Sequence, residues 1–282
     1  MQTKTKEYTH VPYGKTVHGE EEIEAVVNVL RTSTQMGKNV CEFENKIAAL
    51  FNKKYGVMLN SGSSANYLAV ELLSLKKGSE VITPALTFST TVAPLVKNGL
   101  KPAFVDVEDG TYNLDATKVE EMITRETRAM MVPNLIGNLP NWNILYEIAK
   151  KHNLIIIEDS ADTLGATING ISSGNKSDIS NTSFYGSHII NCAGNGGMMC
   201  INDDNLYRKA LLLRSWGRSS SVFIESEKIE RYNFSGIGFI NETKRFYPNQ
   251  ELACHIIGFA GLDNTGLEGV ELAYDKLLIG GN

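Results

Sequence analysis

Two acidic residues close an apolar run near the middle of the sequence. Glu158 and Asp159 end the strand-like part of the segment LIIIEDSAD. Open α/β sheets bind ligands at the carboxyl edge of their parallel strands, so one of these acids is expected beside a ligand. There it could pair with a protonated pyridine nitrogen and make that ring a better electron sink. A solvated acidic loop would explain the same two residues equally well.

A second candidate site lies at residues 60–65, which read NSGSSA and follow the short apolar run GVML. A helical pattern begins here, so Gly62, Ser63 and Ser64 would present free backbone N–H groups and hydroxyls at a helix N-terminus. Such a corner suits a phosphate group. An ordinary serine N-cap without a ligand remains an open alternative for this segment taken alone.

A third candidate is His188, in the segment SFYGSHI that begins at Ser183. An unperturbed imidazole titrates near pH ~6.5, so a histidine can serve as a general base at neutral pH. Residues 194–197 follow it and read GNGG, where glycines permit close backbone approach to a ligand or a positive φ. The other histidines are expected to be ordinary surface or core residues: His10, His18, His152 and His255.

The elements that must position these residues alternate along residues 19–213. Amphipathic helical stretches alternate there with short apolar runs, which predicts an α/β fold with a mostly parallel sheet between helices. Helices are expected at EEEIEAVVNVLRT, CEFENKIAALFN, SSANYLAVELLSL, NWNILYEIAKKH and DNLYRKALLLRS. Strands are expected at VITPA, PAFVDV, AMMVP, LIIIED, NTSFYG and GMMCIN.

Composition narrows the class of protein. The formal charge of −5 comes from 27 basic and 32 acidic residues spread over 282 positions, so no nucleic-acid partner is expected. The N-terminus lacks an apolar secretion segment, and no run approaches the ~20 apolar residues that span a bilayer, so we expect a cytoplasmic protein without membrane contact. The four cysteines show no CxxC spacing, and no metal site or disulfide framework is expected.

Taken together, the segments resemble the DegT-type nucleotide-sugar aminotransferases of the aspartate-aminotransferase superfamily. The likeness covers residues 12–231 and includes NSGSSANYLAV, VITPALTFSTTVAPLVKNG, HNLIIIEDSADTLGA, SFYGSHI and LLRSWGR. It implies the large domain of a fold type I pyridoxal-phosphate enzyme. Its order and spacing make the match specific, although each segment alone would be weak evidence.

The resemblance also implies a role for each candidate residue. The residues expected to bind the cofactor are Gly62, Ser63, Ser64, Phe88, Asp159, Asp162 and Ser183. The serines would hold its phosphate, Phe88 would stack on its ring, and Asp159 would face the pyridinium nitrogen. Asp162 falls where many relatives place a polar residue near the ring.

His188 occupies the position of the lysine that most relatives use to form a Schiff base. An imidazole cannot form that stable imine, so the cofactor would be held without a covalent bond. The resemblance includes a branch with this replacement, the nucleotide-sugar 3-dehydratases that use pyridoxamine phosphate. With His188 and Asp159 as catalytic residues, the expected reaction removes the C3 hydroxyl of a GDP- or CDP-linked 4-keto-6-deoxy hexose in deoxysugar and lipopolysaccharide O-antigen biosynthesis.

Within that branch, one subtype carries an iron–sulfur cluster held by cysteines just after the RxWGR segment. The corresponding stretch here, RSWGRSSSVFIESEKIERYNF, contains no cysteine, so the cluster-free type is expected. A donor such as glutamate would regenerate pyridoxamine phosphate, and the family's sites usually form between two subunits of a homodimer. Two alternatives stay open: a sugar aminotransferase that has lost its lysine, and an inactive fragment.

The character of the sequence changes near residues 232–236, where the alternation of strands and helices stops. We expect residues 1–235 to form the large domain and residues 236–282 to form a separate tail. The tail contains RFYP, GFAGLDNTGLEGVE and YDKLLIG, and it resembles a non-catalytic segment of class B penicillin-binding proteins. The C-terminal small domain of the DegT-type fold would then be missing, and a join of two unrelated reading frames is favoured over a natural fusion.

Overall fold

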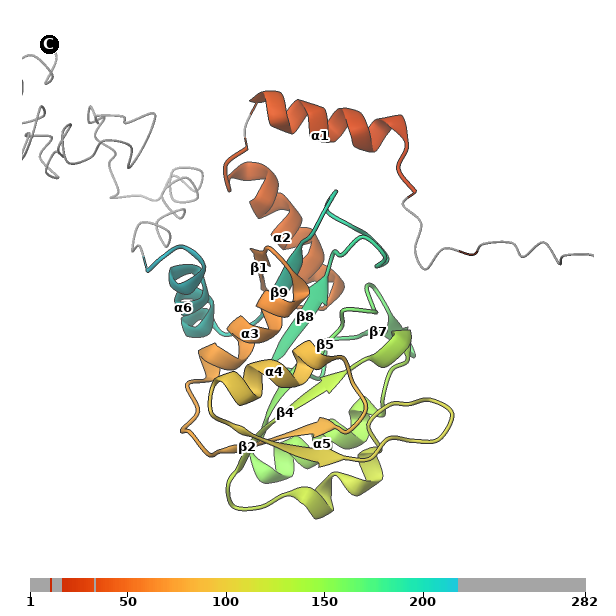
Figure 1. Ribbon diagram of the computed structural model, residues 1–282, viewed down its shortest axis with the longest axis vertical. Coiled ribbons are helices and arrows are strands. Elements are labelled where there is room, and N and C mark those ends of the chain that lie inside the picture. Colours follow the sequence, from red (N-terminus) through yellow and green to blue (C-terminus); the bar gives the residue numbers. More distant parts are fainter. Residues whose placement is uncertain (1–10, 12–16, 33, 218–282) are drawn as a thin grey trace, which may run out of the picture. The chain divides into compact units, whose positions relative to one another are not determined.

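The computed structural model describes residue 11, residues 17–32 and residues 34–217 (Figure 1). The predicted boundary near residue 235 and the whole tail lie outside these residues. In the part of the chain that is described, no helix combines the length and apolarity that a bilayer crossing requires.

A seven-stranded sheet forms the centre of the fold, in the order β1-β9-β8-β5-β4-β2-β3. Its strands are β1 (Tyr55–Leu59), β2 (Glu80–Pro84), β3 (Lys101–Val105), β4 (Thr127–Pro133), β5 (Ile155–Asp159), β8 (Ile179–Ser183) and β9 (Gly197–Ile201). Within this sheet β9 pairs antiparallel with both of its neighbours, and the remaining pairs are parallel. The predicted mostly parallel sheet is therefore confirmed, and β9 begins at the edge where the other strands end.

Six α-helices accompany the sheet in the described residues. They are α1 (Glu20–Thr32), α2 (Lys38–Leu50), α3 (Gly62–Leu73), α4 (Ser89–Lys97), α5 (Trp142–His152) and α6 (Asp204–Arg214). The period of two along a strand sends adjacent side chains to opposite faces. Ile157 of β5 packs in the core cluster that contains Ala65 of α3, whereas Ile156 packs in the cluster that contains Leu145 of α5. Both faces of the sheet are thus covered by helices, as the apolar strands require.

Local sequence explains where several helices begin and end. Asn141 caps α5 and Asp203 caps α6, each by accepting a hydrogen bond from the backbone N–H three residues later. Helix α5 stops at Asn153, which adopts the left-handed conformation with φ 52°. The predicted helix at residues 20–32 has the same bounds as α1, and the other four predicted helices match within three residues.

Several elements differ from the sequence-based expectation. Helix α4 was not predicted, because its nine residues include Pro94 and a run of β-branched residues. The strand predicted at NTSFYG begins two residues earlier, at Ile179, and ends at Ser183. Its sequence, ISNTS, is mostly polar although all of its residues are buried. A search for apolar runs therefore does not find the bounds of this strand. A short hairpin of β6 (Thr167–Ile168) and β7 (Ile171–Ser172) was also not predicted.

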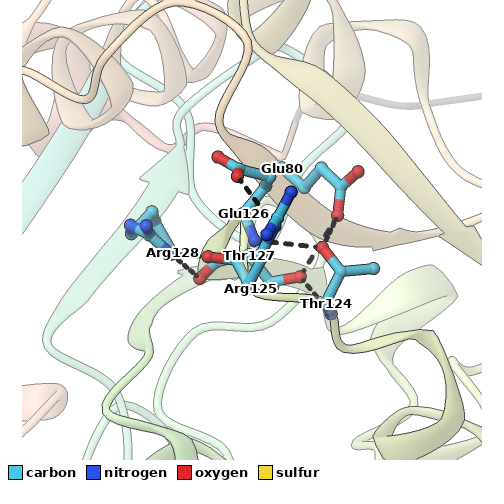
Figure 2. Close-up of polar contacts among 6 residues, drawn as sticks. All are labelled: Glu80, Thr124, Arg125, Glu126, Thr127 and Arg128. Carbon is cyan, nitrogen blue, oxygen red and sulfur yellow. Dashed lines mark hydrogen bonds and ion pairs between the residues drawn. The ribbon is translucent and has the colours of Figure 1, made fainter.

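The amino-terminal edge of the sheet carries a polar cluster that ties β2 to β4 (Figure 2). Thr124 Oγ1 donates to Glu80 Oε2 at 2.5 Å, and Thr127 Oγ1 reaches the same oxygen at 3.4 Å. Arg128 donates to the carbonyl oxygens of Arg125 and Thr127 at 2.7 and 2.8 Å. The cluster fixes the start of β4 beside β2, so the carboxyl ends of both strands meet at the opposite edge.

Candidate active site

A cavity of about 790 Å³ opens at the carboxyl edge of the sheet. It is lined by residues that follow β1, β2, β4, β5 and β8, together with residues that precede β9. The lining includes most of the predicted site residues: Gly62, Ser63, Phe88, Asp159, Asp162, Ser183 and His188. Segments more than 100 residues apart in the sequence therefore contribute to a single pocket.

Ser64 is the one predicted cofactor-binding residue that does not line the cavity. Its backbone N–H donates to Ser61 Oγ at 3.1 Å, and Ser61 Oγ donates to Ser64 Oγ at 3.1 Å. Ser61 is thus the N-cap of α3. Ser63 is exposed toward the cavity at the first turn of the helix, where backbone N–H groups have no intrahelical acceptor.

Two glycines bring this corner together by close packing. A Cβ atom on Gly62 would lie 2.6 Å from Ser183 Cβ, and one on Gly197 would lie 2.2 Å from the Ser61 carbonyl carbon. The N-terminus of α3, the end of β8 and the start of β9 therefore meet at distances that only glycine permits. At Gly197 the predicted close approach is made to the chain itself.

The two adjacent acids of β5 point to opposite faces of the sheet. Asp159 is buried and lines the cavity, where its Oδ2 atom accepts hydrogen bonds from Asn66 Nδ2 at 2.7 Å and Thr91 Oγ1 at 2.8 Å. Burial raises the pKa of Asp159, while the hydrogen bonds from Thr91 and Asn66 oppose that rise. Of the two acids that the sequence offered, Asp159 is the one that faces the pocket.

Glu158 lies instead in a buried polar network on the other face. Its carboxylate accepts hydrogen bonds from Asn134 Nδ2 at 2.8 Å, Ser160 Oγ at 2.8 Å and Ser177 Oγ at 3.0 Å. Lys53 donates to the carbonyl oxygen of Ser177, and burial lowers the pKa of this lysine. These contacts satisfy a buried carboxylate, which would otherwise be costly, and they give Glu158 a structural role.

His188 lies beside a carboxylate in the wall of the pocket. Its Nε2 atom lies 3.7 Å from Asp162 Oδ1, and the ring meets Tyr185 edge-on with centroids 5.8 Å apart. The Nδ1 atom is buried and has no hydrogen-bond partner within the described residues. His188 also lines the cavity, where a neutral imidazole can act as a general base.

The remaining walls come from two loops. Phe88 stands at the N-terminus of α4 with 68% of its surface exposed, so its ring is free to cover a planar ligand. Opposite the histidine, the backbone N–H of Ile136 donates to Asp162 Oδ2 at 3.1 Å. Ile136 has φ 57°, a strained value for a β-branched residue. Asp162 is thus held between the loop after β4 and the histidine.

The donor set fits a phosphorylated pyridine. Asp159 can face a ring nitrogen, Phe88 can cover a ring face, and Ser63 with Ser183 can bind a phosphate beside the free N–H groups of α3. Sequence reasoning missed Ser61, Asn66 and Thr91, which support these groups. A polar residue inside the apolar pattern of α3 was the one available indication for Asn66.

The fold is that of the large domain of pyridoxal-phosphate-dependent enzymes of fold type I. Within that class, the chain belongs to the DegT/DnrJ/EryC1/StrS aminotransferase family, whose model matches residues 16–239. Both the predicted fold and the predicted family are confirmed.

Individual relatives include dehydratases and a synthase. The chain is 38% identical over 215 residues to a dTDP-4-dehydro-2,6-dideoxy-D-glucose 3-dehydratase of Saccharopolyspora spinosa, covering 73% of this chain and 46% of that protein. It is 36% identical over 206 residues to a GDP-perosamine synthase of Caulobacter vibrioides, covering 73% and 53%. The chain thus spans about half the length of these curated relatives.

A solved structure shows the same relationship. The Escherichia coli GDP-4-keto-6-deoxy-D-mannose-3-dehydratase, determined with bound hydrated pyridoxal phosphate, matches with a TM-score of 0.68 and 34% identity. The match covers 72% of this chain and 54% of that one.

Proposed function

We propose that this chain is the large-domain part of an enzyme that dehydrates C3 of a GDP- or CDP-linked 4-keto-6-deoxy hexose in deoxysugar and lipopolysaccharide biosynthesis. The observation that carries the proposal is His188 in the cavity, where no lysine lines the wall among the described residues. A pyridoxal-phosphate enzyme without a lysine in reach must hold its cofactor non-covalently. Two of the relatives above carry the names of sugar 3-dehydratases.

Each residue has a distinct task in this proposal. Bound pyridoxamine phosphate supplies an amine for the sugar ketone and a ring that stores electrons. Asp159 would face the ring nitrogen, Phe88 would cover the ring, and Ser63 and Ser183 would bind the phosphate. His188, which lines the cavity, would take and return a proton as the general base. Ser64 contributes by fixing the Ser61 cap at the phosphate corner.

A product assay tests the proposal. The purified full chain is incubated with pyridoxal phosphate, glutamate and a GDP- or CDP-linked 4-keto-6-deoxy hexose, and the sugar is analysed by mass spectrometry. A product that lacks the C3 oxygen supports dehydration. A product that keeps this oxygen and gains an amino group at C4 contradicts it.

The amino product would instead support the second candidate, a nucleotide-sugar aminotransferase of the same family. The similarity to the Caulobacter vibrioides GDP-perosamine synthase favours this candidate. The absence of a lysine from the cavity-lining residues that the structure describes weighs against it, because aminotransferases use the lysine amine as nucleophile and base.

The proposal also includes a cytoplasmic homodimer that uses glutamate as amino donor. Helix α1 supports the homodimer, because a second subunit could cover its exposed apolar residues. Ile23, Val26 and Leu30 are 47%, 44% and 67% exposed. Light scattering after gel filtration measures the state directly. A monomer would contradict the homodimer.

We further propose that residues 236–282 form a tail separate from the domain at residues 1–235, and that this tail derives from a penicillin-binding protein. Sequencing the genomic reading frame across the junction tests this origin. If the full chain binds no cofactor, as judged by its near-ultraviolet absorbance, the inactive-fragment alternative replaces the enzyme proposal.

A further inference from the structure

The two oxygens of Asp159 have different surroundings. Oδ2 accepts hydrogen bonds from Asn66 and Thr91 at 2.7 and 2.8 Å, whereas Oδ1 accepts one long hydrogen bond, at 3.3 Å, from the backbone N–H of Ala161 among the described contacts. A carboxylate oxygen can accept about two hydrogen bonds. Oδ2 is therefore saturated, and Oδ1 keeps capacity for a donor in the cavity.

Asn66 connects Asp159 to two other elements. Its Nδ2 atom also approaches the carbonyl oxygen of Thr90 at 3.3 Å, and its Oδ1 atom accepts a hydrogen bond from Asn181 Nδ2 at 3.0 Å. An ionised carboxylate can only accept, so the amide nitrogen of Asn66 must face Asp159. With 2% of its surface exposed, Asn66 would be costly in a helix interior without these partners.

The same contacts join the three parts of the pocket. Asn66 follows Ser63 by three residues on α3, and Thr91 follows Phe88 by three residues at the start of α4. The chain segments that carry the phosphate corner, the aromatic wall and the acid are thus linked through one buried network.

We propose that Asn66 and Thr91 are positioning residues that hold Oδ2 of Asp159 and thereby present Oδ1 to the cavity as part of an ionised carboxylate. Charge-assisted hydrogen bonds stabilise the ionised form against the cost of burial. Burial raises the pKa of Asp159, and the hydrogen bonds from Thr91 and Asn66 oppose this rise. The inference concerns the site of the proposed function and depends on that function only for the identity of the group that Oδ1 meets.

The primary experiment needs no cofactor. Thr91→Val removes the donor with little change in volume, and Thr91→Ser keeps it. Carbon NMR of aspartate-labelled full chain, with the Asp159 signal assigned from Asp159→Asn, follows the titration. We expect Thr91→Val to raise the pKa of Asp159 above the wild-type value, and Thr91→Ser to restore it.

Thr83→Val is the matched control. Thr83 is fully buried on β2, and its Oγ1 atom has no hydrogen-bond partner among the described residues. This change should leave the Asp159 titration as in the wild type. If Thr91→Val fails to fold, Thr91→Cys supplies a weaker donor and should give an intermediate rise. Equal titrations in the Thr91 and Thr83 variants would overturn the proposal.

A second readout separates this inference from the proposed function. Spectroscopic titration with pyridoxal phosphate should show about tenfold weaker binding for Thr91→Val, the loss expected from about 1.4 kcal/mol of hydrogen bonding to a charged group. A shifted Asp159 titration in a chain that binds no cofactor would uphold the positioning role and refute the proposed function. Cofactor binding and dehydration with an unchanged titration would refute the positioning role alone.

Discussion

Nε2 of His188 lies 3.7 Å from Oδ1 of Asp162, and both side chains line the cavity. This distance is longer than a hydrogen bond. Asp162 is fixed from the other side by the backbone N–H of Ile136. The proposed base therefore stands beside a carboxylate whose position depends on a strained turn, which links the histidine to the backbone of the loop after β4.

Replacing His188 by asparagine should lower kcat by about 100- to 10,000-fold, because the pocket loses its general base. Cofactor affinity should change little, since asparagine keeps a polar side chain of similar size. The measurement is product formation alongside cofactor titration. His152→Asn is the matched control: His152 contacts Glu120 at 2.7 Å and does not line the cavity. Equal loss of activity in both variants would exclude a specific role for His188.

Ile136→Gly should stabilise the chain by about 1 kcal/mol. The left-handed conformation costs an L-residue roughly 1–2 kcal/mol, and glycine adopts it freely. Ile136 is 68% exposed, so little burial is lost. Urea unfolding of this variant and of Ile189→Gly provides the comparison, because Ile189 is 62% exposed without a positive φ. A loss of stability at both positions would show that the turn is not strained.

Gly197→Ala should destabilise the fold by about 1–3 kcal/mol, the usual cost of forcing atoms into a packed site. The new methyl group would lie 2.2 Å from the Ser61 carbonyl, so α3 and β9 must separate. Gly186→Ala serves as control because nothing lies within 4 Å of its added carbon. Chemical unfolding measures both variants. Similar stability of the two would contradict the close packing of the corner.

The raised pKa of Asp159 should make the free energy of unfolding depend on pH. The folded state keeps this proton at pH values where the unfolded chain has released it, so wild-type stability falls as pH rises from the ordinary value of 3.8 through the folded pKa. Asp159→Asn has no such proton. As pH rises from 3.8 through the folded pKa, the free energy of unfolding of Asp159→Asn should therefore increase relative to that of the wild type. Parallel urea-unfolding curves at every pH would contradict this expectation.

The sequence predicted most of the sheet, five helices and the pocket because those features follow from local patterns. Apolar runs alternate with amphipathic stretches along the sequence, and this pattern predicts strands and helices. Asp159 ends one of the apolar runs. Ser63 was predicted from the expected start of a helix, whereas Phe88 and Ser183 came from the family resemblance. The structure places all of them around one cavity.

What the sequence did not yield depends on contacts between distant segments. The hydrogen bonds of Asn66 with Asp159 and Asn181 span 93 and 115 residues, and no local pattern reports them. The bounds of strand β8 were predicted incorrectly for the same reason, because its polar side chains form hydrogen bonds with other elements. The hydrogen bonds between Ser64 and the cap residue Ser61 were likewise not predicted, and the role of Ser64 as a phosphate ligand stays a prediction.

Because Glu158 and Asp159 are adjacent on β5, the register of β5 with β4 determines which of the two acids faces the cavity. A slip of one residue against β4 would send each acid to the other side of the sheet. Asp159 would then meet the serines that now surround Glu158, and the longer side chain would enter the cavity without its donors. Insertions or deletions in this strand should accordingly be tolerated far less than substitutions of its isoleucines by other branched residues.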